Sequence, residues 1–163
     1  MKSDSIRIAN CSGFYGDKLS VARDMIEGGP IDVLTGDYLA ELTMTILYNQ
    51  RLKRGEQHGY VGTFLKQFRD IAKLAQEKNI KIVTNAGGLN PSSMAESVKE
   101  IIDELNLDLK VAHIEGDDLM PRIDELYQGG ESLTNIDKSL DLQKYEKKPI
   151  TANAYLGAWG IKE

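Results

Sequence analysis

The sequence contains four short apolar runs, each of which ends in glycine and small polar residues, and most of them lead into a segment of helical periodicity. The third run reads IKIVTNAGGLNP over residues 80–91. Runs that are apolar on both faces and alternate with helices are typical of parallel sheets covered on both sides. We therefore predict a doubly wound, Rossmann-like α/β fold with helices on both faces of a mostly parallel sheet. The predicted strands are 6–11, 31–34, 80–84 and 107–114.

Apolar residues at helical spacing predict the intervening helices. Leu19, Ala22, Met25 and Ile26 indicate the first one. The others are expected at 39–53, 63–77, 91–105 and, as a short helix, from Asp117 to Tyr127. Asn90 is a predicted N-cap, because Pro91 suits a first helical turn.

The rest of the chain is predicted to add no second core. At 163 residues the chain has the length of a single domain. Residues 128–149 are rich in Gly, Ser, Asn, Asp and Lys, which predicts a long loop. Residues 150–159 are compatible with a last strand or an edge segment.

Charge and composition exclude several classes of protein. The net charge of −5 gives no electrostatic footprint for nucleic acid. No apolar stretch approaches the roughly 18 residues of a membrane span, and the amino terminus lacks the apolar stretch of a secretory signal. We expect a soluble cytoplasmic protein with no membrane partner, and its single cysteine, Cys11, to be buried and unpaired.

Polar residues gather where the predicted strands end. Parallel strands bring their carboxyl ends to one edge of the sheet, where ligands bind in open α/β sheets. We predict a small-molecule site there, with Asp37 or Asp117 as acid or base, and Asn85 and Asn90 orienting a carbonyl group. The predicted substrate-binding residues are Asn10, Ser12, Asn85, Gly87, Gly88, Asn90, Glu115 and Asn153.

Each junction also has a simpler explanation, because turns between strands and helices favour Gly, Asn, Asp and Ser. We favour an N-cap role for Asp37, which is compatible with ligand contact. His113 and Glu115 share one face of the predicted fourth strand, but a packed histidine is the commoner case, so we assign no metal ligand. Neither a Walker motif nor the dinucleotide fingerprint G-x-G-x-x-G is present, and no cofactor is predicted.

Four segments in order carry a family resemblance: IRIANCSGFYGDKLSVARDMIEGGPIDVLTGDYLAELTM, KIVTNAGGLNP, VAHIEGDDL and TANAYLGAWGI. Together they resemble the amino-terminal part of the acyclic terpene utilisation family, AtuA. The resemblance implies a role beside acyl-CoA carboxylase and hydratase steps in bacterial breakdown of citronellol-type terpenes. The motif members in this chain are Asp37, Asn85, Asn90, Glu115, Asp117 and Asn153.

Family members typically continue beyond the TANAYLGAWGI segment. The resemblance therefore implies a natural short form, a piece of a longer chain, or one part of a split protein. Two functions follow as hypotheses. One is an enzyme domain for a small carboxylated or acyl-CoA-type metabolite. The other is a non-catalytic binding or assembly subunit that forms a homo-oligomer or completes its fold with a partner chain.

Overall fold

The computed structural model describes residues 5–145 and 148–163. The chain forms two compact units, Met1–His113 and Ile114–Glu163. Each unit is described by itself, beginning with the first, which contains the sheet.

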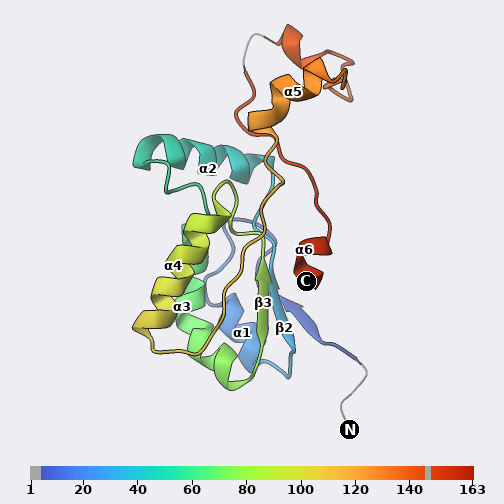
Figure 1. Cartoon of the computed structure of the whole chain (residues 1–163). Coiled ribbons are helices and arrows are strands. Elements are labelled where there is room, and N and C mark those ends of the chain that lie inside the picture. Colours follow the sequence, from blue (N-terminus) through green and yellow to red (C-terminus); the bar gives the residue numbers. More distant parts are fainter. Residues whose placement is uncertain (1–4, 146–147) are drawn as a thin grey trace. The chain divides into compact units, whose positions relative to one another are not determined.

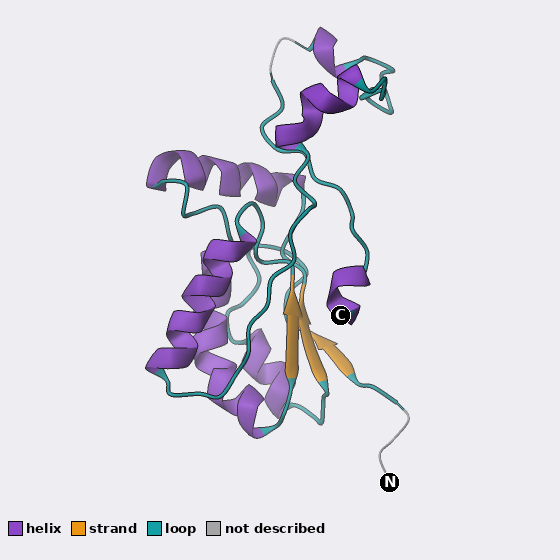
Figure 2. Cartoon of the chain, in the orientation of Figure 1, coloured by secondary structure: helices purple, strands orange, loops and turns teal. Residues whose placement is uncertain are grey.

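The sheet of the first unit has three parallel strands, β1 (Ile8–Asn10), β2 (Val33–Gly36) and β3 (Lys81–Thr84), in the order β1-β2-β3. The three strands lie side by side and point the same way (Figure 2). In the register, Ala9 lies beside Leu34, and Leu34 beside Ile82. The first three predicted strands are therefore confirmed, each with ends shifted by at most two residues.

Four helices follow the pattern predicted from apolar spacing: α1 (Val21–Glu27), α2 (Glu41–Arg54), α3 (Gly62–Glu77) and α4 (Pro91–Glu104). The side-chain oxygen of Asn90 accepts a hydrogen bond from the Ser93 N–H at 3.1 Å, so Asn90 caps α4 as predicted. Pro91 occupies the first turn, where no intrahelical partner for an N–H is needed.

The core lies on one face of the sheet. Two buried clusters fill it, one of which joins α1 and α3 to Leu34, while the other joins α3 to α4. Ala9 and Ile82, which flank Leu34 in the register, pack against these clusters. Helix α3 contacts both α1 and α4, and α3 and α4 run beside each other (Figure 1).

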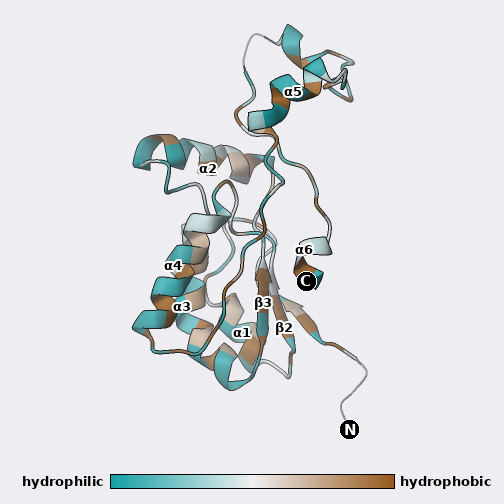
Figure 3. Ribbon diagram, viewed as in Figure 1, coloured by the Kyte–Doolittle hydropathy of each residue, from teal (hydrophilic) through white to brown (hydrophobic). Residues whose placement is uncertain are grey.

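The opposite face of the sheet carries the alternate residues of each strand. Ile8 is 65% exposed, and Val33 and Val83 are half-buried and belong to neither buried cluster. The strands themselves are mostly hydrophobic (Figure 3). A parallel sheet is normally covered on both faces. The α/β class is confirmed, but a doubly wound arrangement is not, because the three strands follow one another without a reversal of order.

The predicted fourth strand at residues 107–114 is wrong. Leu107 and Leu109 pack against the core, but the segment forms no ladder with the sheet. Residues 110–116 are all exposed. The apolar composition of this segment resembles that of a strand, but only Leu107 and Leu109 are half-buried. His113 and Glu115 do not share the face of a strand.

The second unit contains short elements: a 3-10 helix η1 (Met120–Arg122), α5 (Ile123–Gln128), η2 (Leu142–Lys144) and α6 (Trp159–Lys162). The short helix predicted before Tyr127 is confirmed by η1 and α5. Residues 150–159 form no extended strand, since their pairing is limited to one antiparallel bridge between Asp118 and Asn153, and α6 begins at Trp159. None of the described residues of the second unit is fully buried.

Candidate functional site

Asp37 lies where the loops after the three strands meet. Its backbone N–H donates to the carbonyl oxygen of Ser12, in the loop after β1, at 2.9 Å. Its carboxylate oxygen Oδ1 accepts from Nδ2 of Asn85, in the loop after β3, at 2.6 Å. The structure thus brings three predicted site residues, Ser12, Asp37 and Asn85, together at the carboxyl edge of the sheet.

Asp37 does not cap a helix. The N-cap of α2 is Ala40, and no side chain makes a cap hydrogen bond there. The favoured role of Asp37 as an N-cap is therefore wrong, because three more residues follow it before α2 begins. The Asp37 side chain is exposed at the edge of the sheet, with a hydrogen bond to Asn85.

Asn10 is held in the same region by two hydrogen bonds of its side chain. Its Nδ2 donates to the Ser12 carbonyl oxygen at 2.8 Å, and its Oδ1 accepts from the Thr35 hydroxyl at 3.0 Å. Ser12 is buried, and its hydroxyl donates to the carbonyl oxygen of Phe14. The side chains of Asn10 and Ser12 therefore brace the loop after β1.

Beside them, Asp17 closes that loop. Its carboxylate accepts from the N–H groups of Gly13 and Phe14 at 2.6 and 3.3 Å. The loop therefore uses its own carboxylate to satisfy two backbone donors.

Packing accounts for Gly87 and Gly88. A Cβ at Gly87 would lie 2.8 Å from Cβ of Pro91. Gly88 has a φ of +55°, and a Cβ there would meet Leu47 and the carbonyl oxygen of Gly59. The backbone conformation and the close approach of neighbouring segments thus require glycine at position 88.

The side chain of Asn90 makes two hydrogen bonds that hold the backbone in place. Besides capping α4, its Nδ2 donates to the carbonyl oxygen of Glu56 at 2.8 Å. The side chain thus ties the loop before α3 to the start of α4. Contact between Asn90 and a substrate stays a prediction.

The residue after Asp37 carries a buried polar group. The Tyr38 side chain is 2% exposed, and its hydroxyl donates to Oε1 of Gln67 at 2.6 Å. The Cys11 thiol lies 3.9 Å from the same hydroxyl. Burial raises the pKa of both Cys11 and Tyr38 above their usual values, so both stay protonated at neutral pH. Cys11 is buried and unpaired, as predicted.

Sequence reasoning missed Tyr38 and Gln67. A signal for Gln67 exists in the sequence: it stands on the face of α3 that carries Phe64, Phe68 and Ile71. A buried amide on an apolar face requires a polar partner. Gly36 also belongs to this arrangement, because a Cβ there would lie 2.6 Å from the Tyr38 ring.

The remaining predicted site residues lie in the second unit. Nδ2 of Asn153 donates to Oδ2 of Asp117 at 2.9 Å, and both residues are half-buried. Backbone hydrogen bonds of 2.8 Å from Ala154 to Asp117 and from Leu119 to Ala152 hold the two segments together. Glu115 is exposed.

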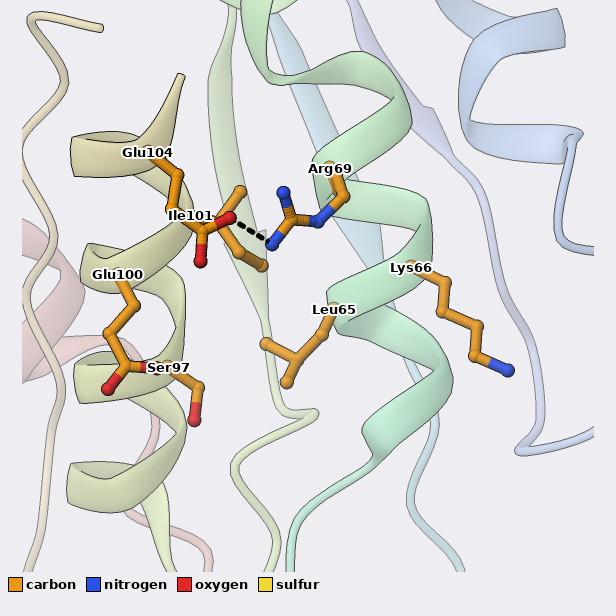
Figure 4. A pocket seen from close by; sticks show the side chains of 7 residues that line it. All are labelled: Leu65, Lys66, Arg69, Ser97, Glu100, Ile101 and Glu104. Carbon is orange, nitrogen blue, oxygen red and sulfur yellow. Dashed lines mark ion pairs between the residues drawn. The ribbon is translucent and has the colours of Figure 1, made fainter. Parts of the chain in front are cut away.

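A shallow cavity of about 350 Å³ lies between α3 and α4 (Figure 4). The ion pair between Arg69 and Glu104, at 2.7 Å, spans it. It contains no predicted site residue. The residues that line it are Leu65, Lys66, Arg69, Ser97, Glu100, Ile101 and Glu104.

Two further findings concern the described residues alone. None of their helices is both long and apolar enough to cross a membrane. No three of their His, Cys, Asp or Glu side chains are grouped so that they could hold a metal ion.

The fold and the polar edge of its sheet define an α/β protein with a parallel sheet and a carboxylate-bearing loop cluster. Residues 6–163 match the family model described as acyclic terpene utilisation family protein AtuA, and the chain belongs to this family. Searches of curated proteins and of solved structures each gave no match.

Proposed function

We propose that this chain is an enzyme domain that acts on a small carboxylated or acyl-CoA-type metabolite, with Asp37 as the acid or base. The observation that carries the proposal is the fixed carboxylate of Asp37, which has no capping role and lies where three loops meet. Membership of the AtuA family supports the connection with catabolism of terpenes and acids.

The reaction that suits such a site is proton transfer next to a carbonyl group. The Asp37 carboxylate takes a proton from the α-carbon of the acyl group, and the electron pair of that C–H bond moves onto the carbonyl oxygen. Return of a proton to the α-carbon reverses the step. In this proposal the substrate lies beside Asn10 and the loops that contain Ser12, Gly87 and Gly88.

Asp117 is the second candidate acid or base, and its site is proposed to include Glu115 and Asn153. The contact between Asp117 and Asn153 repeats the carboxylate–amide pairing of Asp37 and Asn85. Substitutions can separate the contributions of the two carboxylates.

Exchange of α-protons in D₂O tests this proton transfer by itself, apart from any later step of the reaction. Acetyl-CoA and butyryl-CoA are incubated with the protein, and loss of the α-proton signal is followed by NMR. We expect catalysed exchange that Asp37→Asn lowers by about 10²- to 10⁴-fold. Asp103→Asn is the matched control, since Asp103 pairs with Lys99 on α4. Exchange that survives both Asp37→Asn and Asp117→Asn would show that neither carboxylate moves the proton.

The second face of the sheet favours a different function, that of an assembly subunit. Ile8, Val33 and Val83 give this face an apolar part beside Asn10, Thr35 and Lys81. Parallel sheets usually cover both faces with helices. A partner chain that covers this face and adds a strand beside β1 would produce the doubly wound sheet. In that case the partner, or a second copy, completes the fold.

Light scattering over a range of concentrations, combined with pull-down, tests the assembly function. We expect Ile8→Lys to weaken association, because a charge would replace the exposed apolar side chain of Ile8 on this face. Leu52→Lys is the control, as Leu52 is equally exposed but lies on α2. A chain that stays monomeric and recovers no partner would count against this function.

A further inference from the structure

The side-chain amide of Asn85 lies between two consecutive residues of the loop after β2. Its Nδ2 donates to Oδ1 of Asp37 at 2.6 Å, and its Oδ1 accepts from the backbone N–H of Tyr38 at 2.8 Å. One amide group thus contacts both the carboxylate and the next peptide unit. This pairing fixes the orientation of the amide, because a carboxylate requires a donor and an N–H requires an acceptor.

Asparagine suits position 85 better than aspartate or alanine would. Aspartate would have the same size, but it would place a second carboxylate against Asp37, and like charges at this distance repel. Alanine would leave both the carboxylate and the Tyr38 N–H without these partners. The chemistry of the two contacts therefore explains the amide at position 85.

Tyr38 connects this contact to the core. Its ring is buried and packs edge-on against Phe64, with 6.1 Å between the ring centroids. Its hydroxyl donates to the buried Gln67 on α3. The Tyr38 N–H, which donates to Asn85, is therefore part of a segment anchored in the core. Asn85 and Asp37 are themselves exposed.

We infer that Asn85 is a positioning residue for Asp37. It holds Oδ1 of the carboxylate, so that Oδ2 is directed to the ligand in one orientation. In this inference Asn85 acts through Asp37 and not by a contact with the substrate, because one N–H and the oxygen of its amide are directed at Asp37 and at the Tyr38 N–H. The catalytic meaning of this arrangement rests on the proposed function of Asp37.

Two measurements on the same variants test the inference. The Hα–Hβ couplings of Asp37, measured by NMR, report whether its side chain keeps one χ1 rotamer. The rate and KM of α-proton exchange, measured with acetyl-CoA in D₂O, report its action. The variants are Asn85→Ala and Asn85→Asp. Asn49→Ala is the control, because the Asn49 side chain is also exposed and donates to the carbonyl oxygen of Thr45 within α2.

We expect Asn85→Ala to average the Asp37 rotamers and to lower the exchange rate about 10²-fold, the loss that a small misplacement of a reacting group can cause. KM should stay unchanged, because the amide does not bind the substrate. Asn85→Asp, which keeps the shape but not the donor, should have at least the same effect, and it serves if Asn85→Ala does not fold. Asn49→Ala should alter neither quantity.

Three results would overturn the inference. They are a single Asp37 rotamer in both Asn85 variants, averaged rotamers with an unchanged exchange rate, and a raised KM at constant rate, which would make Asn85 a substrate contact. If the wild-type chain exchanges no protons of acetyl-CoA, the proposed acyl-CoA function fails by itself. The couplings then still decide whether Asn85 holds Asp37.

Discussion

The two units of the chain each contain a carboxylate paired with an asparagine amide, but they support the pair differently. Asp37 and Asn85 are attached to a sheet with a buried core, and Tyr38 between them is 2% exposed. Asp117 and Asn153 are held by backbone hydrogen bonds in a unit whose described residues include none that is fully buried. The same polar contact thus lies next to a buried core in one unit and depends on local backbone pairing in the other.

A hydrogen bond positions a side chain only as well as the surrounding structure resists motion. Regions with few buried apolar contacts open locally at low free energy. We therefore regard Asp37 as the better candidate for acid or base, and Asp117 as a group that a ligand or partner would have to order.

Substitution of a central core residue should show the largest contrast. Leu34 is 1% exposed, and Leu34→Ala should lower the free energy of unfolding by about 2–5 kcal/mol through lost burial and a cavity. Leu119→Ala, at a half-buried position of the second unit, should cost about 1 kcal/mol. Urea unfolding followed by circular dichroism measures both. Equal costs would mean that the second unit has a core of similar quality.

Removal of a tyrosine hydroxyl should give the next largest contrast. Tyr38→Phe leaves the buried oxygen of Gln67 without its donor, which should cost about 1–3 kcal/mol. Tyr127→Phe removes a half-buried hydroxyl that donates to Asp141 at 3.0 Å, and water can replace it. Its cost should stay within about 0.5 kcal/mol. A silent Tyr38→Phe would show that the buried pair contributes no net stability.

Removal of an asparagine side chain that accepts hydrogen bonds from backbone N–H groups should give a smaller difference in stability between the two units. Asn90→Ala removes the N-cap of a 14-residue helix, with an expected cost of about 1 kcal/mol in thermal or urea unfolding. Asn135→Ala removes similar bonds, from Asp137 and Lys138, in an exposed turn, and should cost about 0.5 kcal/mol or less. The reverse order would contradict the view that the buried core of the first unit makes its polar contacts contribute more to stability.

The smallest effect should appear in the dependence of stability on pH. Burial raises the pKa of Cys11 above 9.0 and that of Tyr38 above 10.0 in the folded chain. The unfolded chain then loses these protons first, so the free energy of unfolding should fall as pH rises above about 9. Cys11→Ala should reduce the slope between pH 9 and 10. No slope in the wild-type chain would show that neither group changes its pKa on folding.

The sequence predicted the sheet of the first unit because local and global signals agree there. Three apolar runs end in turn residues, and Asn90 with Pro91 marks a helix start by capping chemistry alone. Residues 107–114 have the composition of a strand, but hydropathy cannot show whether a neighbouring strand offers its backbone groups. The predicted N-cap role of Asp37 was wrong for a related reason. The pattern of an N-cap does not reveal that α2 begins four residues later.

The candidate site was predicted in outline. The strand ends identified Ser12, Asp37 and Asn85, and the structure brings these residues together. The sequence does not show which atoms form hydrogen bonds with one another. These partners depend on distances in the folded chain, which spacing along the sequence does not give. Tyr38 and Gln67 were missed because the partners lie 29 positions apart and meet only after α3 packs on the sheet.

The close approach of Gly36 to the Tyr38 ring has a consequence for how this protein can change over time. Any side chain at position 36 would collide with the ring that anchors the loop. A substitution at 36 therefore becomes acceptable only after the ring at 38 has been lost, and loss of the ring alone leaves Gln67 without a partner. Positions 36, 38 and 67 should consequently be inherited as one unit, so that natural variation passes through their joint replacement or not at all.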